Sequence, residues 1–220
     1  MKTKTFLFLL FIVLTSFQCE RLNFDGETKE IISGQILDKN NQPLPNISVR
    51  LFHEGGYSVE SNTANTRTKQ DGSFYIIHPK VINADRTTLF INEGGENGLQ
   101  FKRINANPNF KYVNFERKFN TIKLYAETDI ISVQLIFDTS TSGKTVANIK
   151  IIENDASNEI NIFELEQNDF YNYFFMGNTL KNSSCIVSYD VYTNLNFTPT
   201  TLTHSFTTTD VNYEETIIVN

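Results

Sequence analysis

The chain has 220 residues, 40% of them hydrophobic with 19 Phe among them, and a formal net charge of −6. This apolar content predicts a packed core and argues against general disorder. The acidic balance argues against nucleic-acid binding and against electrostatic docking on anionic lipid. The length suits one large β domain or two domains of about 100 residues.

Residues 1–18 have the pattern of an export leader. Lys2 and Lys4 give it a basic start, and an apolar run follows from Phe6 to Leu14. A bilayer span needs about 20 apolar residues, so this shorter run predicts a leader rather than a permanent span. Its removal takes away two of the 19 basic residues and none of the 25 acidic ones, which leaves a formal charge of −8.

The residue that follows the leader, Cys19, resembles the acylated first residue of bacterial lipoproteins. This resemblance implies a lipid at Cys19 and contact with a membrane through that lipid, at the outer membrane or cell surface. The chain departs from the lipoprotein pattern at Ser16 and Gln18, where an aliphatic and a small residue are usual. The alternative is a soluble periplasmic or secreted protein. Residues 19–30 are polar and lack periodicity, which predicts a tether.

The second cysteine, Cys185, has no partner if Cys19 is acylated. Its β-branched and aromatic neighbours indicate a buried thiol. The alternative is a disulfide between Cys19 and Cys185 in an exported protein.

From residue 31 onward the chain has the two-residue periodicity of β-strands, interrupted by turn-forming residues at 38–43 and 70–72. Asp71-Gly72 favours a tight turn because Gly tolerates a positive φ and Asp can bond the backbone ahead of it. No helical spacing is sustained, so helices are expected to be minor. Three sets of alternating residues are each expected to share one strand face: Ile32, Gly34 and Ile36; Ile47, Val49 and Leu51; Phe74, Ile76 and His78.

The stretch from Ile31 to Phe52, together with Thr68 to Ile76, resembles the carboxypeptidase regulatory-like domain, a transthyretin-like or Ig-like β-sandwich common in exported proteins of Bacteroidota. The resemblance implies a noncatalytic binding module. Asn41 and Asn46 stand where that family often has Gly, and Asn tolerates the left-handed conformation. The matching positions are Gly34, Ile36, Asp38, Pro43, Leu44, Pro45, Val49, Leu51, Thr68, Asp71, Gly72, Phe74 and Ile76.

The second half of the chain echoes the first at a spacing of about 100 residues. Residues 130–138 resemble 31–38, and residues 146–151 resemble 44–49. Either this half is a diverged repeat, or the echoes arise because strands share a vocabulary of β-branched residues. The predicted fold is all-β, with two Ig-like or transthyretin-like antiparallel β-sandwiches in tandem at 31–126 and 127–220.

No arrangement of catalytic or metal-binding residues is recognisable. The histidines at 53, 78 and 204 lack the close pairing of zinc ligands, and no GxSxG nucleophile motif occurs. The acidic residues at 153–169 lack the spacing of a calcium loop and predict a solvated face. The glycines at 55–56 and 94–98 lack the Lys of a phosphate loop. We therefore expect no enzyme, no cofactor and no metal.

The aromatic run at 170–175 is the best candidate for recognition, because flat rings beside amides bind sugars and proteins. Tyr171, Tyr173 and Phe175 are the candidate binding residues. Strand alternation sends these three to one face and Phe170 and Phe174 to the other, so at least one face is expected in the core.

The sequence thus predicts a noncatalytic lipoprotein of the cell envelope that binds or scaffolds an envelope protein. The alternative is a surface carbohydrate-binding or adhesive module whose partner is a glycan.

Overall fold

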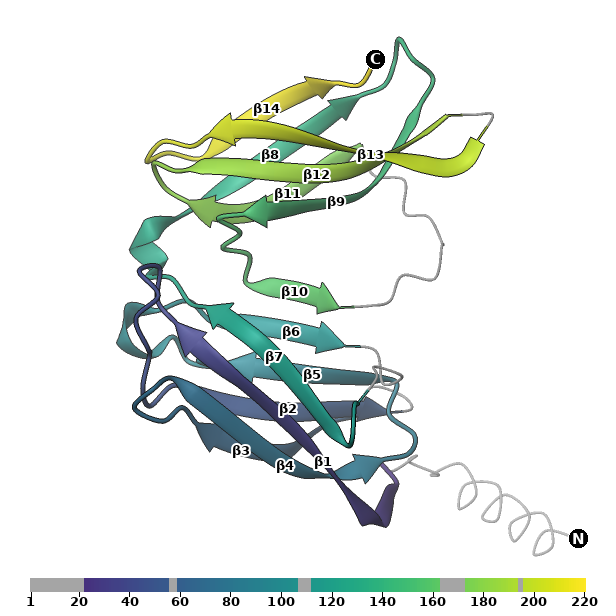
Figure 1. Ribbon diagram of the computed structural model, residues 1–220. Helices are drawn as coiled ribbons and strands as arrows, with labels where there is room; N and C mark the ends of the chain where they lie inside the picture. Colours follow the sequence, from purple (N-terminus) through teal and green to yellow (C-terminus); the bar gives the residue numbers. More distant parts are fainter. Residues whose placement is uncertain (1–21, 56–58, 107–111, 163–172, 194–195) are drawn as a thin grey trace, which may run out of the picture.

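The computed structural model describes residues 22–55, 59–106, 112–162, 173–193 and 196–220. These residues form strands joined by turns, with two short 3-10 helices, η1 (Glu96–Gly98) and η2 (Glu127–Asp129). Two sandwiches are stacked along the long axis of the molecule (Figure 1). The expectation of two β-sandwiches in tandem is confirmed, and most of their strand pairings are antiparallel.

The first sandwich packs a three-stranded sheet against a five-stranded sheet. The order of the first sheet is β4-β1-β7, with β4 antiparallel and β7 parallel to β1. The order of the second sheet is β10-β6-β5-β2-β3. The strands are β1 (Phe24–Leu37), β2 (Ser48–Gly55), β3 (Val59–Arg67), β4 (Ser73–Val81), β5 (Arg86–Ile91), β6 (Lys102–Ala106), β7 (Glu116–Lys123) and β10 (Glu159–Ile162).

The second sandwich packs the sheet β11-β8-β14 against the sheet β13-β12-β9. Its first strand, β8, again has an antiparallel neighbour on one side and a parallel one on the other. The strands are β8 (Ile130–Asp138), β9 (Thr145–Glu153), β11 (Phe174–Leu180), β12 (Ser184–Thr193), β13 (Asn196–Thr207) and β14 (Tyr213–Ile218).

Both sandwiches therefore share one strand order. The pairings of β1, β2, β4, β5, β6 and β7 recur in β8, β9, β11, β12, β13 and β14, and only β3 and β10 lack a counterpart. This is the arrangement that a diverged repeat would produce, and the repeat itself stays a hypothesis.

Each sandwich has its own core, built from the alternating residues of its strands. Eight of the nine residues in the three predicted alternating sets are buried, including His78 at 1% exposure. Ile47 lies one residue before β2 and faces the same core. The second core includes Val133, Leu135 and Phe137 from β8 and the free thiol of Cys185, which is buried as predicted.

Asn41 and Asn46, at which the resembled domain often has Gly, adopt left-handed backbone, with φ of 63° and 61°. The Asp38 carboxylate accepts hydrogen bonds from the backbone N–H groups of Asn40 and Gln42, both at 2.8 Å. The first predicted turn is therefore present and stabilised by its own side chain.

The tether predicted at 19–30 is shorter in the structure, because β1 already begins at Phe24. Phe24 pairs with Val81, and Lys29 pairs with Pro79. This part of β1 is mostly exposed on both faces. Backbone pairing alone therefore holds it in the sheet, and its side chains do not have to alternate between apolar and polar. A polar sequence can therefore form strand here, which the periodicity did not indicate.

One strand from the predicted second unit, β10, joins the first sandwich. It pairs in parallel with β6, from Glu159 opposite Arg103 to Ile162 opposite Ala106. In Figure 1 it lies between the two sandwiches. The range 127–220 therefore does not form a sandwich of its own throughout.

Candidate binding surfaces

The predicted binding residues fall into three groups. Cys19 and Tyr171 lie outside the described residues. Tyr173 is 46% exposed at the start of β11, whereas Phe175 is half-buried and packs against the second core. Phe175 therefore belongs to the core rather than to a binding surface. Strand alternation had predicted that one of the two faces of the aromatic run would be in the core. The exposed aromatic ring on β11 is its neighbour Phe174, at 46%.

The outward side of the sheet β11-β8-β14 carries exposed apolar side chains. Phe174 lies directly opposite Ile136 on β8, and Met176, two residues further along β11, is 63% exposed. Ile218 on β14 is also 63% exposed and lies opposite Asp138, two residues from Ile136. We call these four residues, Phe174, Met176, Ile136 and Ile218, the apolar face.

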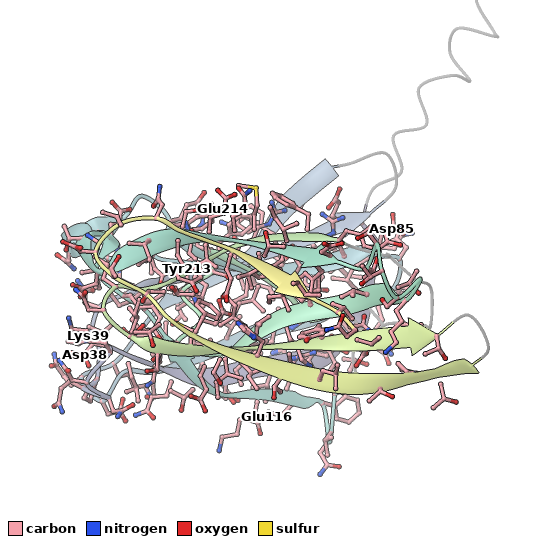
Figure 2. All side chains as sticks on the ribbon, turned by 90° about the horizontal axis from the view of Figure 1, so that it is seen from above. Asp38, Lys39, Asp85, Glu116, Tyr213 and Glu214 are labelled. Carbon is pink, nitrogen blue, oxygen red and sulfur yellow. The ribbon has the colours of Figure 1, made fainter. Side chains whose placement is uncertain are left out.

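A groove of about 560 Å³ crosses the outward side of the sheet β4-β1-β7. Tyr75, Ser33 and Lys118 are in register across the three strands, and Tyr75 is 45% exposed. Ser33 donates a hydrogen bond of 2.6 Å to the Glu116 carboxylate, and Glu116 lies at the edge of the molecule in Figure 2. A ring beside hydroxyl, ammonium and carboxylate groups suits a hydroxyl-rich ligand. The alternative of a carbohydrate-binding module stays a hypothesis, and this groove is its best location.

A second cavity of about 440 Å³ opens where the two sandwiches meet, and we call it the junction cavity. Lys102 of β6 lines it and is only 2% exposed. Burial lowers the pKa of the Lys102 ammonium, and the nearby Asp155 opposes that shift.

His53 and His78 are 25 positions apart in the sequence but lie next to each other inside the first sandwich. The ring centroids of His53 and His78 are 5.2 Å apart, and both side chains are buried. Burial lowers the pKa of His53 to about 4 and also lowers that of His78. The two-residue alternation along β2 and β4 places both histidines on the inward face of their strands, and this pattern could have predicted that they lie close together. The third histidine, His204, lies 3.1 Å from Glu215.

Within the described ranges, no group of three or more His, Cys, Asp or Glu side chains is placed to hold a metal ion. The acidic residues Glu164, Glu166 and Asp169 lie outside those ranges. For the same described part of the chain, no helix has the length and apolarity that crossing a membrane requires.

No family model matches the chain, and no curated protein matches it. The resemblances to carboxypeptidase regulatory-like domains and to lipoproteins therefore stay predictions.

Among solved structures, the shaft pilin SpaA from Lactobacillus rhamnosus GG is similar over 88% of this chain and 98% of its own, at 8% identity and a TM-score of 0.37. A 3-chlorocatechol 1,2-dioxygenase from Rhodococcus opacus 1CP matches 49% of this chain at 12% identity and a TM-score of 0.35, and a 9R-lipoxygenase from Cyanothece PCC8801 matches 47% at 16% identity and a TM-score of 0.32. The chain spans only 62% of that dioxygenase and 18% of that lipoxygenase. Likenesses this distant carry no argument about function.

Proposed function

We propose that this protein is a noncatalytic binding or scaffolding module of the cell envelope, anchored by a lipid at Cys19, and that it engages a partner protein through the apolar face. The observation that carries the proposal is the exposure of Phe174, Met176 and Ile218 on one side of one sheet.

An antiparallel sheet that faces water on one side normally alternates apolar residues inward with polar residues outward. In β8 and β14 the inward positions follow this rule, since Val133, Leu135 and Ile217 are buried. The outward positions of β11 break it with Phe174 and Met176. Because exposing such side chains to water is unfavourable, contiguous exposed apolar residues mark interaction surfaces more often than chance.

The apolar face is also suited to a protein rather than to a small ligand. Its residues lie on the outward side of a sheet and line neither the groove on β4-β1-β7 nor the junction cavity. Gln134 and Glu214 stand in register with Met176 on the neighbouring strands and supply a polar margin. An apolar centre with a polar margin is the composition of a protein–protein interface.

The test of the apolar face is cross-linking in cells. A photoreactive residue at position 176 is expected to give a discrete adduct, which Phe174→Ser together with Ile218→Ser should abolish. A photoreactive residue at Val211, which is 65% exposed and lies outside the apolar face, is the matched control. Identical adducts from positions 176 and 211, or none from position 176, would contradict the proposed interface.

The lipid anchor is tested separately. Only four residues separate Cys19 from the start of β1 at Phe24, a reach of at most roughly 18 Å, so an anchored protein would stay close to the membrane. Wild type is expected to incorporate a labelled fatty acid and to sediment with membranes, and Cys19→Ala is expected to do neither. Unlabelled wild type would remove the anchor from the proposal while leaving the apolar face intact.

A further inference from the structure

The side chain of Lys102 is 2% exposed, and no described residue accepts a hydrogen bond from its Nζ atom, although that atom is not fully sealed from solvent. Among the described residues, its Nζ atom makes no hydrogen bond and no ion pair, and its nearest ring contact is Tyr125, with the centroid 6.0 Å away. An ammonium group in water has three hydrogen bonds to give, and a buried charge without them is costly. Buried polar groups in native proteins nearly always have a partner, so Lys102 Nζ is expected to give its hydrogen bonds to an acceptor from outside the chain, either water or a ligand in the cavity.

Lys102 lines the junction cavity, whose walls come from both halves of the chain. Ile104 of β6 and Ile122 of β7 are buried apolar wall residues, and Ile152 of β9, which is 50% exposed, lines the cavity from the second sandwich. The rings of Phe119 and Tyr125 add to the apolar lining, and Thr121 and Asn154 add uncharged polar groups. A pocket that is mostly apolar with a few converging polar groups is the usual form of a small-molecule site.

The charges around the cavity favour a ligand with a single negative charge. Two lysines, Lys102 and Lys123, and one carboxylate, Asp155, line it. The Asp155 carboxylate already accepts a hydrogen bond of 2.8 Å from the backbone N–H of Ser157, which ties it to its own turn. The net formal charge of the lining is therefore positive by one, and Lys102 is the deepest of the charged groups.

We propose that the junction cavity binds a small organic monoanion, a carboxylate on an apolar body, with Lys102 Nζ donating to the carboxylate. The isoleucine and tyrosine walls would contact the apolar body, and Lys123 at the partly exposed side would add the second positive charge. An inorganic anion fits less well, because it has no apolar body to contact those walls. Since residues 152–155 form one wall, the ligand would also hold the two sandwiches together.

Titration of the full chain with benzoate, monitored by calorimetry and thermal unfolding, tests this site. Wild type is expected to bind benzoate saturably and to melt at a higher temperature in its presence. Benzamide, which has the same ring without the charge, and phosphate should give no such shift. Lys102→Met should weaken benzoate binding by about tenfold or more, because it removes a charged hydrogen bond. Lys150→Met, which removes one positive charge from an exposed position of β9, should leave it unchanged.

Equal responses to benzoate and benzamide, or equal benzoate affinity in wild type and Lys102→Met, would overturn the site. A measurement on wild type guards against a variant that fails to fold: benzoate should slow acylation of the Lys102 amine by an activated ester and should not slow that of Lys150. Acylation of Lys102 at an unchanged rate in saturating benzoate would likewise overturn it. None of these results depends on the apolar face, so the two proposals fail independently.

Discussion

At the scale of single residues, the paired histidines of the first sandwich form a neutral buried network. His78 Nδ1 lies 3.0 Å from the carbonyl oxygen of Pro79, which can only accept, so Nδ1 carries the proton. His78 Nε2 is then the acceptor for the Tyr112 hydroxyl at 3.3 Å. His53 Nδ1 forms a hydrogen bond of 2.8 Å with the Thr63 hydroxyl. Each ring is held neutral, and a proton on either would be buried beside the other ring.

This network predicts that the protein loses stability in mild acid. The folded pKa of His53 is lowered from 6.5 to about 4, because burial penalises its charged form and because His78 lies close by. Below pH 6.5 the unfolded chain therefore binds more protons at His53 than the folded chain does. The stability that comes from a neutral His53 is fully present above pH 6.5 and is lost as the pH falls toward 4. The free energy of unfolding should drop by about 3 kcal/mol over this window.

Urea unfolding of wild type and His53→Gln at a series of pH values measures this effect. The glutamine amide can still bond Thr63 but does not titrate, so the variant should be less stable at pH 7 and should lose less stability between pH 6.5 and 4. Parallel pH profiles for the two proteins would show that His53 does not carry the proton uptake.

At the scale of elements, the turn between β3 and β4 depends on one glycine. Gly72 has a φ of 75°, and a Cβ there would lie 2.4 Å from the carbonyl oxygen of Ile36. The adjacent Asp71 carboxylate accepts hydrogen bonds from the Ser73 N–H and hydroxyl, which also lowers the Asp71 pKa. The turn therefore needs both a left-handed backbone and close approach to β1.

Gly72→Ala is expected to cost about 2–4 kcal/mol of unfolding free energy, from backbone strain and from the clash with the Ile36 carbonyl. Gly98→Ala is the matched control, because Gly98 has a φ of 66° and open space around its missing Cβ. The control should lose only about 1 kcal/mol, the cost of the backbone conformation alone. Equal losses in chemical denaturation would mean that the close approach to β1 does not matter.

Elements buried on one face were predictable from the sequence, and those at sheet edges were not. Ile32, Ile47 and Ile76 had to face a core, so the two-residue period revealed their strands. The first part of β1 is held by backbone pairing with β4, and β10 is held by backbone pairing with β6. Backbone pairing of this kind does not require alternating side chains, so the sequence pattern did not reveal these strands. The apolar face was missed for a related reason: alternation defined two faces of the aromatic segment but could not tell which one the core would take.

At the scale of the whole molecule, the two sandwiches are joined by a buried polar contact between residues far apart in the sequence, which no local sequence pattern could predict. Gln100 is 1% exposed, and its amide nitrogen donates to the Ala156 carbonyl at 3.0 Å and to the Asn158 side chain at 2.8 Å. Its amide oxygen accepts from the Tyr125 N–H at 3.0 Å. Ala156 in turn donates to the Asn178 carbonyl next to the second core. One side chain therefore connects the first sandwich to the segment that leads into β10.

Gln100→Met should loosen this connection without disturbing either core. It keeps the side-chain length but leaves the Ala156 carbonyl and the Tyr125 N–H without partners, which costs about 2–4 kcal/mol if both stay buried. We expect faster hydrogen exchange at the amides of β10 and unchanged exchange at the centres of β2 and β12, because those strands do not depend on the junction. Gln134→Met, on the outward side of β8, is the matched control and should exchange like wild type. Unaltered exchange in β10 of Gln100→Met would mean that pairing with β6 alone holds the strand, whereas faster exchange throughout both sandwiches would mean that they unfold as one unit.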